Sequence, residues 1–398
     1  MGLGVDEAAA VEVARAQPMA EWVERWAAVN SGSRNLDGLS IVADMLADEF
    51  SGLPGELNLV AADPVEAVDD GGGAHNVPHG ASLHLRVRPD APVQVLLTGH
   101  MDTVYGTDHP FQAVTAREPG VLQGPGVADM KGGIAIMLAA LRGLEVSGAA
   151  RRIGYEVVIN ADEEVGSAAS ASLIARAARG KAAGLTYEPA LTPEGTLAGA
   201  RPGSGNFALV VRGRSAHAGR NPEEGRNALV AAADLALRLH RAVAPGLKIN
   251  PARISGGGPN NVVPDFALLR VNMRPAKPEH EARAQALLAE VAEAVSAEHD
   301  VAVSTHGRFG RPPKPLSEGS ERLLGLVRDA GATLGQAIEW RPSGGVCDGN
   351  NVAACGVPVV DTMGVRGGAI HSSDEYLLLD SLPERAALSA LTLARLAA

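Results

Sequence analysis

Two apolar, strand-like runs flank one long apolar helix, and this arrangement limits the chain to a few folds. Residues 93–97 and 154–160 are mostly apolar, as in strands of a sheet that is covered on both faces. Between them, residues 132–144 form a helical run rich in Ala, Ile, Met and Leu. The order strand, polar loop, helix, strand predicts an α/β domain.

The length of the chain and a change in the order of its expected strands and helices predict a second domain. The 398 residues exceed what one ordinary core organises. From about residue 201, four strands interleave with two helices, which predicts an inserted α+β unit. The strands are expected at 206–213, 251–255, 266–273 and 301–306, and the helices at 227–240 and 280–299. The larger domain is therefore expected to span residues 1–200 and 313–398, with residues 201–312 inserted.

Further runs complete the predicted larger domain. Helices are expected at 7–15, 19–29, 39–50 and 317–330 and from Ser381 onward, and strands at 57–61, 82–87 and 357–361. The glycine triplet 71–73 predicts a hairpin or a surface loop.

Charge, cysteine content and hydropathy exclude several classes of partner. The formal net charge is -11 and no basic block is present, so neither nucleic acid nor an anionic membrane surface is expected to be a partner. Cys347 and Cys355 are too few for a disulfide framework. The N-terminus lacks the pattern of a signal peptide and no apolar run approaches the roughly 20 residues of a membrane span. We expect a cytoplasmic protein, or a periplasmic one if a leader was removed.

Polar residues follow the first apolar strand directly. His100 and Asp102 stand two residues apart at its carboxyl end, the edge at which open α/β sheets place ligands. On extended backbone both side chains point to the same side, so Asp102 can fix the tautomer of His100. Taken alone, this pair is better explained as a surface turn.

Further acids and one histidine are predicted at the same edge. Asp129 lies on a glycine-dense turn before the apolar helix, where it could also simply cap that helix. The second apolar strand is followed by three successive acids that include Glu163 and Glu164. Glu188 follows a third apolar run, and His371 lies beyond the strand 357–361. A solvated charge run is the competing interpretation of the acids.

Imidazole and carboxylate donors together suit Zn²⁺ or another borderline divalent cation. The set is large enough for two ions about 3.5–4 Å apart, which would hold a water and a substrate carbonyl oxygen together. One of the two adjacent glutamates would remain as a general base.

With these motifs the chain resembles the M20 metallopeptidases, the group of glutamate carboxypeptidases, aminoacylases, acetylornithine deacetylases and succinyl-diaminopimelate desuccinylases. The matching segments, in order, are GHMDTV, GPGVADMKGG and ADEEVGS, and they begin at His100. The resemblance implies that His100 is a metal ligand, that Asp102 orients it and that Asp129 bridges two metal ions. It also implies a cis peptide between Asp129 and Met130.

The same resemblance assigns the remaining residues of the centre. It implies that Glu163 is the general acid/base, that Glu164 and His371 bind one metal ion, and that Glu188 joins His100 on the other. The fold it implies is a zinc-exopeptidase-like catalytic domain with a mixed sheet and an inserted ferredoxin-like lid and dimerisation domain.

The inserted unit carries further motifs of this family. The resemblance implies that His217 donates to the oxyanion, typically across the interface of a homodimer, although a solvent-facing histidine is the plain alternative. It implies substrate contacts at Asn261 and at Arg274, whose guanidinium suits a carboxylate. Arg311 and the turn at Gly344 and Gly345 resemble further pocket segments. Arg366, shortly before His371, is expected either to take part in recognition or to support its loop.

These expectations describe a dinuclear hydrolase of amide bonds. A water held by two divalent ions, Zn²⁺ or else Co²⁺ or Mn²⁺, would be deprotonated by Glu163 and attack the amide carbonyl. We expect a carboxypeptidase that releases a C-terminal, glutamate-like amino acid from N-acyl or peptidyl substrates. An N-acyl-amino-acid deacylase or dipeptidase is the close alternative, and a non-catalytic metal-binding homologue is the alternative from another class.

Overall fold

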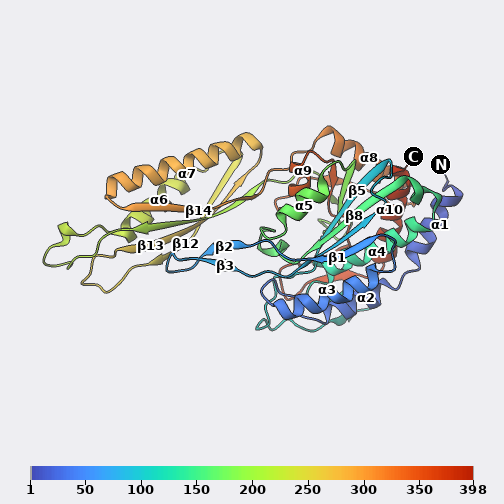
Figure 1. Ribbon diagram of the computed structural model, residues 1–398, viewed down its shortest axis with the longest axis horizontal. Coiled ribbons are helices and arrows are strands. Elements are labelled where there is room, and N and C mark those ends of the chain that lie inside the picture. The colour runs from blue at the N-terminus through green and yellow to red at the C-terminus, as the bar shows by residue number, and fades with distance from the viewer. Residues whose placement is uncertain (1, 398) are drawn as a thin grey trace. The chain divides into compact units, whose positions relative to one another are not determined.

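The computed structural model describes residues 2–397, which form two compact units. The larger unit comprises the chain up to Asp63, Pro78–Ala200 and the chain from Leu316 onward. The smaller unit comprises Pro64–Val77 and Arg201–Pro315. Helices and strands occur in both units (Figure 1), and the main sheet of the larger unit is mixed, so the predicted α/β class is confirmed.

A six-stranded sheet in the order β1-β4-β8-β5-β9-β16 forms the centre of the larger unit. The strands are β1 (Glu56–Val60), β4 (Ser82–Val87), β5 (Val93–His100), β8 (Ile153–Asn160), β9 (Ala183–Thr186) and β16 (Val359–Val360). β4 pairs antiparallel with both β1 and β8, whereas β8, β5, β9 and β16 run parallel to one another. In the register of β5 and β8, His100 lies opposite Asn160, so both strands end at the same edge.

Helices cover both faces of this sheet because its central strands are apolar on both sides. Leu97 and Val157 belong to one apolar cluster with residues of α1, α2, α3, α4, α8 and α10, whereas Leu96 and Val158 belong to another with residues of α5 and α9. The first group is α1 (Val5–Arg15), α2 (Met19–Ala27), α3 (Leu36–Phe50), α4 (Gly132–Glu145), α8 (Glu318–Thr333) and α10 (Ser381–Leu396). The second is α5 (Ala171–Ala178) and α9 (Asp348–Ala354). No helix within residues 2–397 is both long and apolar enough to cross a membrane.

The third helix begins three residues before the predicted residue 39. Its first turn is fixed by Asn35, whose side chain accepts a hydrogen bond from the backbone N–H of Gly38 at 3.2 Å. Such a cap satisfies one of the free N–H groups at the start of a helix. Hydrophobic periodicity alone starts at the first buried apolar residue and therefore misses the capped turn.

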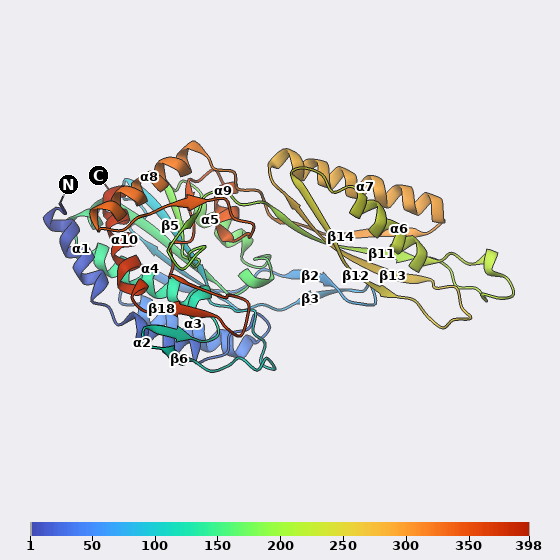
Figure 2. The ribbon, with the colours of Figure 1, turned by 180° about the vertical axis from the view of Figure 1, so that it is seen from behind.

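Two smaller sheets complete the larger unit. One has the order β17-β18-β7-β6 and is visible from behind in Figure 2. Its strands are β6 (Thr115–Glu118), β7 (Val121–Gln123), β17 (Gly367–Gly368) and β18 (Tyr376–Leu378). The other pairs β10 (Leu197–Ala198) with β15 (Trp340–Arg341). Because β18 pairs with β7, the loop before β18 lies beside the turn that follows β7.

The smaller unit is an antiparallel sheet in the order β12-β13-β11-β14 with two helices on one face (Figure 1). Its elements are β11 (Ser204–Arg212), β12 (Leu247–Gly256), β13 (Phe266–Pro275), β14 (Ala302–Arg311), α6 (Ala228–Arg241) and α7 (Pro278–His299). Leu209 and Leu269 of the sheet pack against Leu235 of α6 and Leu288 of α7. This core joins every element that was predicted for the inserted segment.

A hairpin from the N-terminal part of the chain also belongs to the smaller unit, which corrects the predicted boundary. The strands β2 (Val65–Val68) and β3 (Ala74–Val77) flank the glycine triplet, as expected for a hairpin. Val68 packs with Val210 and Leu268, and Asp70 forms ion pairs with Arg253 and Arg270 at 2.8 and 3.2 Å. The expectation that all of residues 1–200 form one domain is therefore wrong for Pro64–Val77, and the smaller unit extends to Pro315 instead of residue 312.

Candidate metal centre

The carboxyl ends of three parallel strands deliver the predicted residues to one edge of the main sheet. His100 is the last residue of β5. β8 ends at Asn160, and Glu163 and Glu164 follow it on a short helical turn. Glu188 lies two residues beyond the end of β9, which runs parallel to β5. Polar side chains are tolerated here because they lie beyond the apolar part of each strand.

Asp129 lies between the two predicted histidine ligands. Its Oδ1 is 3.1 Å from Nε2 of His100, and its Oδ2 is 3.3 Å from Nε2 of His371. Oε2 of Glu188 lies 3.8 Å from the His100 nitrogen, and Oε2 of Glu164 lies 3.2 Å from the His371 nitrogen. One carboxylate thus faces two nitrogen–carboxylate pairs, which is the donor arrangement that two neighbouring divalent cations require.

Glu163 also lies within reach of this centre. One nitrogen or oxygen atom from each of His100, Glu163 and Glu188 lies within 4.8 Å of the others. One such atom from each of His100, Asp129 and Glu164 also lies within 4.8 Å of the others. The distances therefore permit Glu163 either to touch a metal ion or to face a water beside it.

The charges of the centre favour a cation. Hydrogen bonds to Asp129 and Glu164 raise the pKa of His371 to about 11. Burial alone would lower the pKa of His100, but hydrogen bonds to Asp102 and Asp129 raise it well above its usual value. Burial and the charge of Asp129 raise the pKa of Glu164 to about 7. Metal ligands must be deprotonated, so a divalent cation that binds these groups would displace protons from them.

Asp102 connects His100 to the segment that carries the two glutamates. Its Oδ1 lies 3.3 Å from Nδ1 of His100 and accepts the backbone N–H of Glu163 at 3.1 Å. Its Oδ2 accepts the backbone N–H of Glu164 at 3.2 Å and the hydroxyl of Ser33 at 2.7 Å. The carboxylate is fully buried. It therefore orients an imidazole and a loop at the same time, which is more than the sequence predicted for it.

The turn that carries Asp129 is tightly packed. Gly126 has a φ of 74°, a conformation that favours glycine, and the peptide bond between Asp129 and Met130 is cis, as the resemblance implies. A Cβ at Gly133 would lie 1.9 Å from the backbone oxygen of Tyr187, the residue before Glu188. The glycine-dense sequence thus lets the turn approach the neighbouring ligand segment closely.

Two buried charged residues beside this turn were not predicted. Glu375, four residues after His371, accepts hydrogen bonds from the backbone N–H groups of Ala128 and Asp129. The ammonium group of Lys131 is buried and donates to Ser31 Oγ at 2.8 Å, and its burial lowers its pKa to about 8. The sequence contains no signal for the burial of Glu375, because its segment has the composition of a polar loop.

A third buried acid, Asp348, stabilises the segment that carries the two glutamates. Asp348 accepts hydrogen bonds from Asn160 Nδ2 at 2.7 Å and from Ser167 Oγ at 2.6 Å. Asn160 and Ser167 flank the segment of Glu163 and Glu164 on either side. Asp348 therefore fixes both ends of that segment from a part of the chain whose role the sequence left open.

Four predicted residues lie in the smaller unit. His217 and Asn261 are brought together there, since the backbone N–H of Ala218 donates to the carbonyl oxygen of Asn261. Arg274 lies on β13, where its Nε donates to Asn272 Oδ1 at 3.0 Å. Arg311 is buried at the end of β14. Their predicted contacts with a substrate remain predictions.

The remaining predicted residues of the larger unit lie outside the metal centre. Gly344 and Gly345 are exposed in the loop between β15 and α9. Arg366 forms ion pairs with Asp380 and Glu384, both at 3.0 Å, which favours the interpretation that it supports its loop. Both cysteines are free, as expected.

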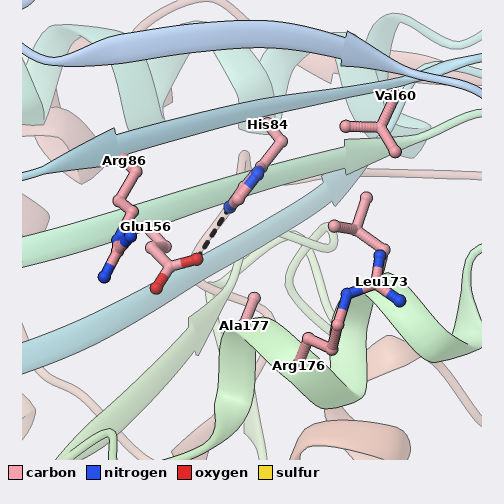
Figure 3. A pocket seen from close by; sticks show the side chains of 7 residues that line it. All are labelled: Val60, His84, Arg86, Glu156, Leu173, Arg176 and Ala177. Atoms are coloured by element: carbon pink, nitrogen blue, oxygen red, sulfur yellow. Dashed lines mark hydrogen bonds and ion pairs between the residues drawn. The ribbon is translucent and has the colours of Figure 1, made fainter.

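A separate cavity of about 300 Å³ lies on the larger unit, and none of the predicted residues lines it (Figure 3). It is bounded by Val60, His84, Arg86, Glu156, Leu173, Arg176 and Ala177. Glu156, one of these lining residues, is already paired with His84 at 2.7 Å and with Lys181 at 2.8 Å. We assign no role to this cavity.

Comparisons with known proteins agree with this geometry. Residues 96–395 match the sequence profile of peptidase family M20/M25/M40. The chain is 30% identical over 387 residues to carboxypeptidase G2 of Pseudomonas sp. (strain RS-16), covering 92% of this chain and 86% of the relative. It is also 30% identical over 323 residues to a succinyl-diaminopimelate desuccinylase of Xanthomonas oryzae pv. oryzae (strain MAFF 311018), covering 75% and 82%.

Solved structures share the fold. An M20 family metallo-carboxypeptidase from Sulfolobus solfataricus superposes with a TM-score of 0.73 at 14% identity, covering 96% of this chain and 99% of that one. The match to the family profile extends over most of the chain and includes every residue of the centre from His100 to His371. The chain therefore belongs to peptidase family M20/M25/M40 and is a metal-dependent peptidase or amidohydrolase.

Proposed function

We propose that the protein is a dinuclear carboxypeptidase that releases a C-terminal, glutamate-like amino acid from N-acyl or peptidyl substrates. The position of Asp129 is the observation that carries the proposal, because its two oxygens face the nitrogens of His100 and His371 separately. In this proposal His100 and Glu188 would hold one ion, His371 and Glu164 would hold the other, and Asp129 would be a ligand shared by both. Zn²⁺ suits this set of nitrogen and oxygen donors, and Co²⁺ or Mn²⁺ are the alternatives.

The bound ions would polarise the amide carbonyl and lower the pKa of a water molecule. Glu163 takes the proton of the attacking water and later gives it to the leaving amine, which is the two-step role of a general base and acid. Asp102 holds the backbone of Glu163 while it orients His100. The base is thus positioned relative to a ligand of the centre through one buried carboxylate.

The smaller unit supplies the proposed substrate contacts. His217 donates an N–H to the oxyanion that develops on the attacked carbonyl oxygen. Arg274 and Asn261 bind the free α-carboxylate of the substrate, for which a guanidinium provides two parallel donors. Arg311 of this unit, and Gly344 and Gly345 of the larger unit, are further proposed substrate contacts. The similarity to carboxypeptidase G2 over 92% of this chain supports the carboxypeptidase branch.

A homodimer is the proposed assembly. Helix α6 of the smaller unit exposes Val230 and Leu237, which lie seven residues apart and therefore on one face, at 52% and 51% of their surface. Exposed apolar side chains on one helix face suit a contact with a second copy. Light scattering should give a dimer for the wild type and a monomer for the double variant V230D/L237D.

A panel of substrates tests the proposed activity. The Zn²⁺- or Co²⁺-loaded protein should hydrolyse N-acyl-glutamates faster than N-acetyl derivatives of neutral amino acids or neutral dipeptides. Preferred hydrolysis of N-acetyl amino acids or dipeptides would instead support the deacylase or dipeptidase alternative. A loaded protein that hydrolyses none of them would support a non-catalytic homologue.

A matched pair of variants tests the substrate role within this panel. Arg274→Gln should raise KM for N-acyl-glutamates by about 10-fold or more, because a charge-assisted pair to the carboxylate is lost. Arg253→Gln removes an arginine from the neighbouring strand β12, where it pairs with Asp70, and should leave KM unchanged. Equal KM values for the wild type and Arg274→Gln would remove Arg274 from the proposed site.

A further inference from the structure

Glu375 is a buried acid with an unusual set of partners. Its exposure is 1%, although its neighbour Asp374 is exposed. Its Oε1 accepts the backbone N–H groups of Ala128 and Asp129, both at 3.0 Å. Its Oε2 accepts the hydroxyl of Tyr105 at 2.8 Å. A carboxylate is costly to bury, so three donors on one side chain indicate a specific task.

These contacts join three segments of the chain. Tyr105 lies in the loop after β5, the strand that ends at His100. Asp129 lies on the turn after β7, and Glu375 ends the loop between β17 and β18 that contains His371. The hydroxyl of Tyr105 also lies 2.8 Å from the backbone oxygen of Ser372, which is adjacent to His371. A single side chain therefore links the loops of three residues of the centre.

We propose that Glu375 is a positioning residue for the metal centre, which it serves by holding the turn of Asp129 against the loop of His371. The 3.3 Å approach of Asp129 Oδ2 to His371 Nε2 would depend on this link. The side chain of His371 is 52% exposed, so packing alone holds it weakly. Hydrogen bonds that fix its loop are therefore needed to position it as a ligand. This inference rests on the proposed role of both residues as metal ligands.

A positional role can be separated from a purely electrostatic one. Glutamine has the same length, and its amide oxygen can accept both backbone N–H groups. Its amide N–H₂ can donate to the Tyr105 oxygen, and the single hydroxyl hydrogen of Tyr105 is then directed to the backbone oxygen of Ser372. Glu375→Gln therefore keeps the link and removes the negative charge. Glu375→Ala removes both.

The test is the affinity for Zn²⁺ of the metal-free full chain, measured by competition with a chelator. Glu375→Ala should weaken binding by about 10–100-fold, the range found for residues that orient metal ligands. Glu375→Gln should bind within about 3-fold of the wild type, because the geometry is kept. The matched control Asp374→Asn removes a neighbouring exposed charge and should leave the affinity unchanged.

Affinities that differ from these expectations in the following ways would overturn the inference. Wild-type affinity in Glu375→Ala would show that the link does not matter for metal binding. Equal weakening in Glu375→Gln and Glu375→Ala would assign the effect to charge. A wild-type protein that binds no Zn²⁺ would overturn the metal centre itself, which distinguishes failure of the proposed function from failure of this inference.

A second variant covers the case in which Glu375→Ala does not fold. Tyr105→Phe removes one hydroxyl and keeps the ring, and it should weaken Zn²⁺ binding by about 2–10-fold. The midpoint of thermal unfolding of the metal-free chain, compared between variants, shows whether a weakened affinity follows from loss of the fold. Unchanged affinity in Tyr105→Phe, with the fold intact, would contradict the proposed link between the three loops.

Discussion

The backbone N–H of Glu163 donates a hydrogen bond of 3.1 Å to Oδ1 of Asp102. The same carboxylate faces His100, so the proposed base and a proposed metal ligand are oriented by one side chain. Glu163 lies on a loop, and loops are ordinarily the less rigid parts of a fold. Its attachment to a buried carboxylate at the end of a central strand gives it a fixed position without placing it in the sheet.

Substitution of Asp102 by Asn should disrupt this arrangement. The amide N–H₂ of Asn would face one of the two backbone N–H groups that the carboxylate now accepts, so two donors would oppose each other. We expect kcat/KM to fall by about 10–100-fold. The control Ser33→Ala removes only the hydroxyl that donates to Asp102 and should cost less than about 10-fold. Wild-type kcat/KM in Asp102→Asn would contradict this role.

Metal binding should release protons at neutral pH. The pKa of His371 is raised to about 11 and that of Glu164 to about 7, so in the metal-free protein His371 is charged and Glu164 is partly protonated at pH 7. A metal ion needs both groups deprotonated, so its affinity should rise with pH. Titration calorimetry in buffers of different ionisation enthalpy should give more than about one proton released per chain.

The control for proton release is His371→Ala, which should lower the number of released protons by about one. An enthalpy that does not depend on the buffer would contradict the assignment of His371 and Glu164 as ligands. An affinity that falls as the pH rises from 6 to 8 would contradict it as well, because deprotonation could not then favour binding.

Gly133→Ala should destabilise the protein where an ordinary helix glycine would not. A Cβ at Gly133 would lie 1.9 Å from the backbone oxygen of Tyr187, so the helix α4 or the segment of Glu188 must move. We expect a cost of about 1–3 kcal/mol in the free energy of unfolding, measured in urea by circular dichroism. Gly325→Ala in α8 meets no atom within 4 Å and should be neutral or stabilise the protein by up to about 1 kcal/mol. Equal effects would contradict the close approach.

Most of the metal centre could be predicted because its residues directly follow apolar strands. The parallel register of β8, β5 and β9 places His100, Glu163 and Glu188 at one edge, and alternation and apolar runs in the sequence reveal such strands. His371 gives a weaker signal, since it lies well beyond the strand predicted at 357–361 and follows only the two-residue strand β17, so its role as a ligand rested on the resemblance.

The buried charged residues beside the metal centre, and the exact boundary between the two units, could not be predicted in this way. Glu375 and Lys131 are charged residues that look solvent-exposed in the sequence, and only the fold buries them. The hairpin of β2 and β3 packs through Val68 on strands more than a hundred residues away. Short-range periodicity shows that a hairpin forms but contains no information on which sheet it covers.

The central claim is that Glu163 acts as a base beside a metal centre that other residues hold. Its most direct test is the hydrolysis of an N-acyl-glutamate by Glu163→Ala in a sample whose metal content is measured at the same time. The variant should keep two metal ions per chain while kcat falls by about 10²–10⁴-fold, because only the proton transfer is lost. Full activity in this variant, or loss of the bound metal together with activity, would contradict the account.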